Sequence, residues 1–232
     1  MTTMHAAEYV AGFAKTEIAH IDPTFCLFGW GDQQNLPTRV HAPLFARAIV
    51  LEHLTTGKKL AYVVCDLLAI SESVRTHVVD RLAADGHGFA EEEIALTATH
   101  THSGPSGYST YLLYAINAPG FSVEVHDGIV DAIVDAVLRA RMHAEPARLF
   151  VDERAIPVSE PIAWNRSLHA YNRNLDATPL PEDRADEAVN RTMTVLAVDS
   201  VAGRKLGLVA WFGLHGTCVH RDRRADLKRD LR

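Results

Sequence analysis

Apolar and polar positions along the chain predict strands and helices in a mixed order. The segment 45–54 is rich in apolar and β-branched residues, and 60–68 is a nearly continuous apolar run. The intervening Thr55-Thr56-Gly57-Lys58 has the composition of a turn, so the two segments are expected to pair as a hairpin. A continuous apolar run is typical of a strand that is buried on both faces. Five further strands are expected, at 9–18, 94–99, 148–156, 193–198 and 206–212.

Helical periodicity is clearest at 123–142, where apolar residues recur every three to four positions and Glu145-Pro146 follows as a stop. A second helix is expected at 71–82, with Ser71 as its N-cap. The polar, proline-containing stretch 165–186 is expected to form a long loop.

These elements together predict an α/β fold that is built on a mixed β-sheet with flanking helices. Strands alternate with helices, which favours parallel pairs, whereas the direct hairpin requires an antiparallel one. A chain of 232 residues can bury a substantial core, and we expect a single domain over 1–232. Ligand sites in open α/β sheets form at the carboxyl ends of strands. Residues that directly follow a predicted strand are therefore the first candidates for a site.

Composition narrows the classes of partner. A formal net charge of -6 supplies no basic footprint, so no nucleic-acid partner is expected. No apolar run approaches the roughly 20 residues that span a bilayer, so no transmembrane segment is expected. Residues 1–14 lack a basic stretch followed by an apolar one. No signal peptide is therefore evident, and a cytoplasmic location is the default expectation. Cys26, Cys65 and Cys218 are scattered, which suits a reduced compartment.

Two of the 13 histidines follow a predicted strand at a spacing of two residues. In an extended segment, this spacing would place the rings of His100 and His102 on one face. The following Ser103-Gly104-Pro105 would turn the chain away and leave the pair at a pocket rim, where imidazole nitrogens suit zinc. The alternative is a pair of half-buried histidines whose rings bond to backbone carbonyls.

Two further residues stand at predicted strand ends. His215 follows an apolar strand, so three imidazoles could converge if the strands are neighbours. Asp66 ends the buried run, where its carboxylate would either fix an imidazole tautomer or act in a purely structural way. His220 lies in a charged tail and is expected to be solvated.

Four ordered motifs over about residues 10–219 resemble the neutral ceramidase family, also described as neutral/alkaline non-lysosomal ceramidases. They are a glycine loop, a histidine run, an asparagine-arginine segment and a later histidine motif. In order, these are Phe28-Gly29-Trp30-Gly31 with Arg47-Ala48, Thr99-His100-Thr101-His102-Ser103-Gly104-Pro105, Asn165-Arg166-Ser167 with Ala170-Tyr171 and Asn174, and Trp211-Phe212-Gly213-Leu214-His215-Gly216-Thr217. Leu168 and Leu175 depart from the family pattern, which has prolines there.

The resemblance implies a zinc-dependent hydrolase. Members of the family cleave the amide bond of ceramide-like N-acylsphingosines into a sphingoid base and a fatty acid. Their zinc ion is held by two histidines, a glutamate and a tyrosine, which implies His100 and His215 as the histidine ligands here. His102 and Arg166 would be catalytic residues that contact substrate or orient the amide. Gly29 would lie at the pocket wall, where backbone can approach the ligand.

The resemblance also implies that the chain is a truncated N-terminal part. Family members continue well beyond this length, and the later part carries the glutamate and tyrosine ligands. A separate chain would then supply that part, and the expected partner is a ceramide-like lipid with peripheral membrane contact. Family members are often secreted or surface-associated.

Two alternatives stay open at this point. One is a non-catalytic remnant or lipid-binding module of the same fold. The other is an unrelated metallohydrolase that uses His100, His102 and His215 as a three-histidine site with an open fourth position.

Overall fold

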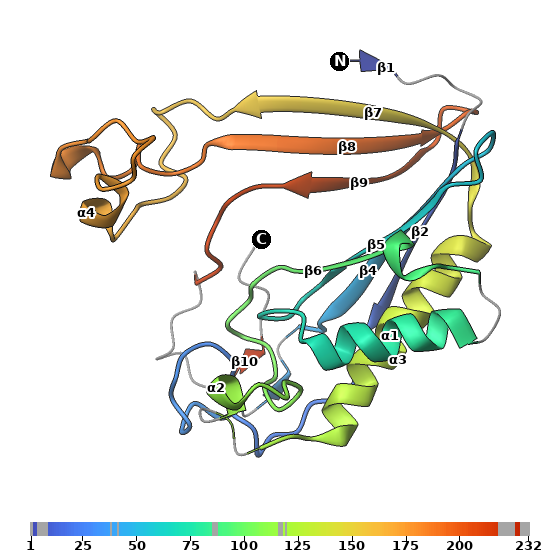
Figure 1. Cartoon of the computed structure of the whole chain (residues 1–232), viewed down its shortest axis with the longest axis horizontal. Helices are drawn as coiled ribbons and strands as arrows, with labels where there is room; N and C mark the ends of the chain where they lie inside the picture. The colour runs from blue at the N-terminus through green and yellow to red at the C-terminus, as the bar shows by residue number, and fades with distance from the viewer. Residues whose placement is uncertain are drawn as a thin grey trace. The chain divides into compact units, whose positions relative to one another are not determined.

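A computed structural model describes residues 2–3, 9–37, 39–40, 42–84, 88–115, 118, 120–217 and 226–227 (Figure 1). The chain falls into two compact units. The helix–sheet unit comprises 6–147 and 216–232, and the strand unit comprises 1–5 and 148–215. The expectation of a single domain over 1–232 stays a prediction. Cys218 and His220 lie outside the described residues.

The helix–sheet unit is built on neighbouring strands in the order β6-β5-β4-β2. The strands are β2 (Tyr9–Glu17), β4 (Phe45–His53), β5 (Lys59–Cys65) and β6 (Ile94–Ala98). β4 pairs antiparallel with both β2 and β5, whereas β5 and β6 are parallel. The predicted hairpin and the predicted mixed sheet are therefore confirmed.

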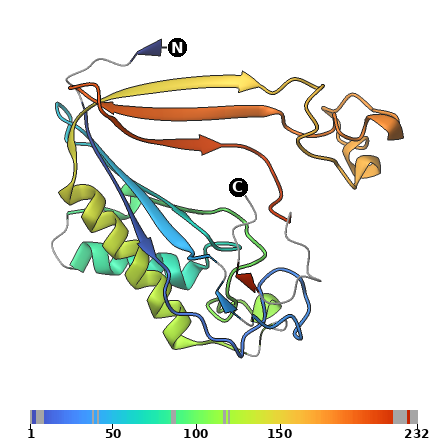
Figure 2. The ribbon, with the colours of Figure 1, turned by 180° about the vertical axis from the view of Figure 1, so that it is seen from behind.

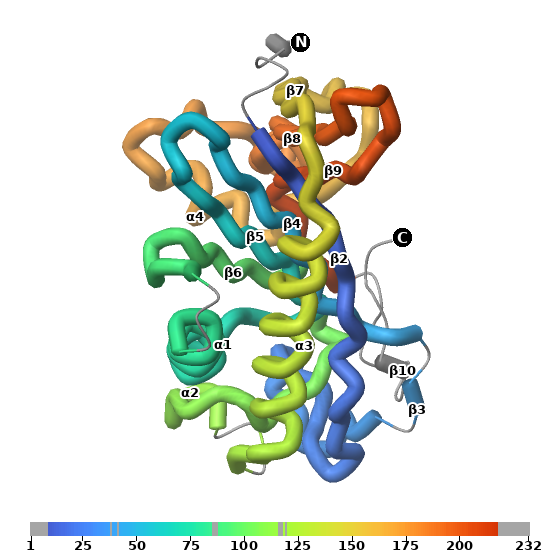
Figure 3. Tube along the Cα trace, turned by 90° about the vertical axis from the view of Figure 1, so that its right-hand side faces the viewer, coloured from blue at the N-terminus to red at the C-terminus, as the bar shows by residue number. Residues whose placement is uncertain are grey.

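Two long helices lie on one face of these strands (Figure 1 and Figure 3). They are α1 (Glu72–Ala84) and α3 (Val123–Met142), and α3 has the predicted bounds. Ser71 caps α1 as predicted, because its Oγ accepts a hydrogen bond of 3.3 Å from the Val74 N–H. Ser122 caps α3 through an equal bond of 3.3 Å from the Val125 N–H.

The core of this unit lies between the helices and one face of the sheet. Ala61, Val63 and Cys65 of β5 are fully buried with residues of α1 and α3. Their neighbours Tyr62 and Val64 are only partly buried. The prediction that this run is buried on both faces is therefore wrong for β5, because both helices cover the same face.

The strand unit contains three long strands, and a long loop joins the first two of them (Figure 2). Its sheet has the order β7-β8-β9, and β1 pairs antiparallel with β7. The strands are β1 (Thr2–Thr3), β7 (Glu145–Ala155), β8 (Thr192–Ser200) and β9 (Lys205–Trp211). β7 begins three residues earlier than predicted, so Pro146 lies inside the strand instead of before it. The first residues of β7 belong to the helix–sheet unit, where they pair with β2.

The predicted loop 165–186 is confirmed apart from two short helical turns, α4 (Leu168–Tyr171) and η2 (Glu182–Arg184). The Arg191 guanidinium holds the ends of this region together by donating to the carbonyls of Ile156 (3.0 Å) and Asp186 (3.1 Å). The remaining elements belong to the helix–sheet unit. They are β3 (Arg39–Val40), η1 (Glu91–Glu93), α2 (Leu112–Ala115) and β10 (Asp226–Leu227), which pairs parallel with β3. No helix in the described residues is long and apolar enough to cross a membrane.

Candidate functional site

The histidine run leaves the sheet at the carboxyl ends of two parallel strands. Cys65 at the end of β5 pairs with Ala98 at the end of β6, and the Thr99 N–H extends the ladder by donating to the Cys65 carbonyl (2.9 Å). His100 therefore emerges at the same edge as Asp66 and Leu68, which follow β5. The predicted position of the run at a strand end is confirmed.

His100 has an unusual backbone and a defined ring orientation. Among the described residues it is the one non-glycine residue with positive φ, at 59°. Strained backbone of this kind persists where the surroundings enforce it, and such residues cluster at functional sites. The ring Nδ1 lies 2.8 Å from the carbonyl oxygen of Leu68. A carbonyl can only accept, so Nδ1 donates, and the neutral ring carries its acceptor lone pair on Nε2.

His102 is buried beside His100, with the two ring centroids 5.1 Å apart and the planes at 85°. The predicted cause of this closeness is wrong. The positive φ of His100 ends the extended backbone, so a turn brings the rings together instead of the alternation of a strand. Trp30 holds His102 from the other side, because its indole N–H donates to the His102 carbonyl (2.9 Å) and its ring meets the imidazole edge-on.

Gly29 makes room for the His102 ring. Its φ is +98°, and a Cβ at this position would lie 2.6 Å from the His102 Nδ1. The absent side chain thus accommodates a histidine of the same site, and its role beside a bound ligand stays a prediction. Gly29 and His102, which are far apart in sequence, are brought together by the fold.

Backbone bonds tie the glycine loop to the histidine run. Leu27 forms an isolated β-bridge with Pro105, and the Phe28 N–H donates to the Gly104 carbonyl (3.1 Å). The stretch 101–109 is buried throughout. The loop and the run therefore form one packed substructure, in which Gly29, Trp30 and His102 have fixed neighbours.

Asp66 holds the backbone at the base of the site. Its carboxylate is fully buried, and Oδ2 accepts from the Phe45 N–H (3.0 Å) and from the Arg47 guanidinium (2.8 Å). The His100 ring is instead oriented by the Leu68 carbonyl. These contacts favour the structural role over the tautomer-fixing role. Arg47 belongs to the glycine-loop motif, and no local pattern in the sequence predicts its pairing with Asp66.

Replacing Asp66 by asparagine is expected to lower the free energy of unfolding by about 2 kcal/mol, because two bonds to a buried charged acceptor weaken. Urea unfolding followed by circular dichroism measures this change. The matched control is Asp131→Asn, since Asp131 is exposed and pairs with Arg81 on the surface. The control should shift stability by less than about 0.5 kcal/mol. Equal effects in both variants would contradict the structural role of Asp66.

Two buried groups beside the site are held in their protonated forms. Burial, followed by the charge of Asp66, raises the pKa of the Cys65 thiol well above its usual range. Burial likewise raises the pKa of Tyr108, whose hydroxyl donates to the Ala69 carbonyl (2.9 Å). Neither residue offers an anionic nucleophile at neutral pH.

The other two predicted site residues belong to the strand unit. Arg166 is exposed on the long loop, two residues before α4 begins. Its neighbour Asn165 shapes the turn, because its Oδ1 accepts from the Ser167 N–H (2.8 Å) and its Nδ2 donates to the Ala188 carbonyl (2.9 Å). His215 is exposed beyond the end of β9 and is the last residue of the strand unit. The next residue, Gly216, already belongs to the helix–sheet unit.

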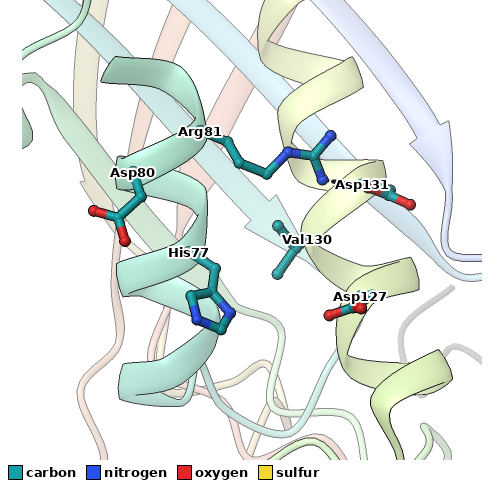
Figure 4. A pocket seen from close by; sticks show the side chains of 6 residues that line it. All are labelled: His77, Asp80, Arg81, Asp127, Val130 and Asp131. Carbon is teal, nitrogen blue, oxygen red and sulfur yellow. Dashed lines mark hydrogen bonds and ion pairs between the residues drawn. The ribbon is translucent and has the colours of Figure 1, made fainter. Parts of the chain in front are cut away.

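A separate surface groove of about 310 Å³ lies between α1 and α3 (Figure 4). Its lining residues are His77, Asp80, Arg81, Asp127, Val130 and Asp131. Arg81 forms an ion pair with Asp131, and Asp80 points away from the carboxylates of α3. The groove is therefore a solvated polar surface. Among the described residues, its histidine and carboxylates do not form a group that could hold a metal ion.

Comparison with known proteins gives consistent matches. A family model described as neutral/alkaline non-lysosomal ceramidase, N-terminal, matches residues 9–225. The chain is 31% identical over 212 residues to a neutral ceramidase of Pseudomonas aeruginosa, covering 91% of this chain and 30% of that protein. A neutral ceramidase of Mycobacterium tuberculosis is 30% identical over 198 residues, covering 83% of this chain and 30% of that protein.

Solved structures match at the level of the fold as well. A crystal structure of neutral ceramidase from Pseudomonas aeruginosa has a TM-score of 0.87 and 30% identity, over 96% of this chain and 34% of that chain. A structure described as ceramidase complexed with C2 has a TM-score of 0.86, over 95% of this chain and 33% of that chain. The chain thus spans about a third of the length of the proteins that it matches.

Proposed function

Because this chain belongs to the neutral/alkaline non-lysosomal ceramidase family, we propose that it forms part of a zinc-dependent amide hydrolase. Its substrate would be a ceramide-like N-acylsphingosine, and the products would be a sphingoid base and a fatty acid. The relatives that match are ceramidases by name. The observation that carries the proposal is His100, with its enforced positive φ and its Nδ1 bonded to the Leu68 carbonyl.

The His100 ring fits a metal ligand. A ligating histidine almost always donates its other ring N–H to a carbonyl or carboxylate, which fixes the tautomer and raises the basicity of the ligating nitrogen. The Leu68 carbonyl supplies that partner for Nδ1, so Nε2 is the nitrogen that would bind zinc.

His215 is the second proposed ligand. His215 takes this role because it lies in the later histidine motif, Trp211-Phe212-Gly213-Leu214-His215-Gly216-Thr217, which resembles that of the family. His215 is bonded to Gly216, the residue at which the chain enters the helix–sheet unit. Zinc held by His215 would add its binding free energy to the stability of the liganded state.

Zinc, when bound, lowers the pKa of a coordinated water to about 7 and polarises a carbonyl oxygen. His102 has an intrinsic pKa near neutrality, which suits proton transfer or a hydrogen bond to the reacting amide. Arg166 carries a permanent charge and can donate two parallel hydrogen bonds, which suits the amide oxygen or a substrate hydroxyl. The Trp30 ring meets the His102 imidazole edge-on and Gly29 leaves room for it, which together orient the ring nitrogens of His102.

A zinc titration of the 232-residue chain tests the ligand assignment without any substrate. His100→Ala and His215→Ala are each expected to weaken binding by at least about ten-fold, since even the loss of a group that only orients a ligand costs that much. His102→Ala is the matched control and should retain the metal. Calorimetry measures the affinity, and unchanged affinity in the first two variants would refute the assignment. Loss of metal in His102→Ala would favour the three-histidine alternative.

Turnover distinguishes the hydrolase from the lipid-binding alternative, which the exposed apolar segment at α2 favours. Together with a chain that supplies the glutamate and tyrosine ligands, the zinc-loaded chain is expected to release fatty acid from a fluorescent short-chain ceramide. Its His102→Ala variant should release the fatty acid more slowly. Binding of the ceramide with no release in either protein would support the lipid-binding module.

A further inference from the structure

An uncharged stretch separates the histidine run from α3. Residues 103–123 contain no aspartate, glutamate, lysine, arginine or histidine. The stretch contains α2 (Leu112–Ala115) and ends at the N-terminus of α3. Residues 103–109 are buried, whereas residues 110–114 are exposed.

Six large apolar or aromatic side chains are exposed on this second part. Leu112 and Leu113 are the most exposed, at 77% and 71%. The other four, about half-exposed, are Tyr111, Tyr114, Phe121 and Val123. Soluble surfaces rarely gather so many apolar side chains without a binding partner.

The two ends of the segment are fixed to the fold. The Tyr111 N–H donates to the Ser109 hydroxyl (3.3 Å), and the Tyr111 hydroxyl donates to Glu72 of α1 (2.8 Å). At the other end, the Ser122 N–H donates to the Gly107 carbonyl (2.8 Å), while its side chain caps α3. The leucines therefore project from an anchored turn and have no path into the core.

Aromatic contacts connect this surface to the histidine site within the same unit. The buried Phe28 ring meets Tyr114 edge-on, with centroids 5.9 Å apart, and meets Tyr108 in the same way at 5.5 Å. The next residue in the chain is Gly29, which lies against the His102 ring. A ligand that covers Tyr114 therefore lies on a ring that contacts Phe28, and Phe28 directly precedes Gly29 of the histidine site.

We propose that the surface formed by Tyr111, Leu112, Leu113, Tyr114, Phe121 and Val123 docks onto a zwitterionic lipid bilayer. The proposal rests on the proposed function, in which the substrate is a membrane lipid. Leucines insert below the headgroups, and the tyrosine rings lie at the level of the headgroups. Such a surface would place the histidine site against the membrane that presents the substrate.

The charges around the surface favour a neutral membrane. The stretch itself carries no charge, and its flanks are acidic, with Glu72 and Glu124. An anionic bilayer attracts basic segments, which are lacking here. A second copy of the chain is disfavoured by area, because the six partly exposed side chains offer about 600 Å², whereas a stable interface buries about 800 Å² per partner.

Flotation of the 232-residue chain with phosphatidylcholine vesicles tests the docking surface. The variant Leu112→Ser with Leu113→Ser is expected to bind about a hundred-fold more weakly, at about ten-fold for each inserted leucine. The matched control is Leu54→Ser with Met142→Ser, two exposed apolar residues of the same unit that lie outside the surface. The control should bind like the parent chain.

The dependence of vesicle binding on salt concentration and on lipid charge is a second test. Binding should not change between low and high salt, and phosphatidylserine should not strengthen it. Failure of the parent chain to bind, or equal binding by the leucine variant, would overturn the proposal. A dimer in sedimentation that dissociates in the leucine variant, with no vesicle binding by either, would assign the surface to self-association and overturn it as well.

The assay keeps this inference separable from the proposed function. The vesicles contain no ceramide, and the buffer contains a chelator, so neither zinc nor turnover affects the result. Matching thermal unfolding of the variants shows that they remain folded, as expected for side chains that are more than half exposed. Docking can thus be confirmed while zinc binding fails, or the reverse.

Discussion

Replacing Gly12 by alanine is expected to lower the free energy of unfolding by at least about 3 kcal/mol. A Cβ at Gly12 would lie 1.9 Å from the carbonyl oxygen of Ala140 and 2.8 Å from the backbone nitrogen of Ala144. Both are backbone atoms, so no side-chain rotation relieves the overlap. β2 is held by β4 on one side and β7 on the other, while α3 packs on the sheet. The helix must therefore move away from the strand and lose core contacts.

A comparison of the free energies of urea unfolding of Gly12→Ala and Gly57→Ala isolates the effect of the close approach between α3 and β2. Gly57 has a positive φ of +66°, but a Cβ at this position would meet no atom within 4 Å. Its substitution should cost only about 1–2 kcal/mol, from the left-handed backbone. Similar losses in the two variants would contradict the packing of α3 against β2. A Gly12→Ala chain that does not refold agrees with the prediction.

Elements with strong local signals were predictable from the sequence. The helix α3 has the predicted bounds because its apolar stripe is long and a capping serine precedes it. The hairpin of β4 and β5 was predictable because two apolar runs flank a short turn. The predicted start of β7 is three residues too late, because a proline usually marks a boundary, whereas Pro146 lies within a paired strand.

The site depends on contacts that no local pattern encodes. The partner of the His100 Nδ1 is a backbone carbonyl 32 residues away, and any residue type at Leu68 would supply the same oxygen. The positive φ of His100 comes from packing, since histidine has only a weak preference for this conformation. Motif resemblance nevertheless selected Gly29 and His102, which do meet. Resemblance therefore identified the residues, and the structure explains their arrangement.

Replacing Gly29 by alanine is expected to cost about 2–4 kcal/mol of stability and to displace the His102 ring. The new Cβ would lie 2.6 Å from Nδ1 and 2.8 Å from Cε1 of His102, and 2.8 Å from a methyl group of Leu68. Neither neighbour can yield easily, because Trp30 and His100 flank the His102 ring. Leu68 also carries the carbonyl that orients His100, so both histidines are affected.

Gly31→Ala is the control for this substitution. Gly31 lies in the same loop with φ +66°, but a Cβ there would meet no atom within 4 Å. Both variants share the backbone strain, so the difference between their unfolding free energies measures the clash with His102. Histidine NMR signals should shift in Gly29→Ala and stay in place in Gly31→Ala. Unshifted signals in Gly29→Ala would mean that His102 does not occupy the space above Gly29. In that case the first interpretation of Gly29 would hold, in which it lies at the pocket wall and faces the substrate itself.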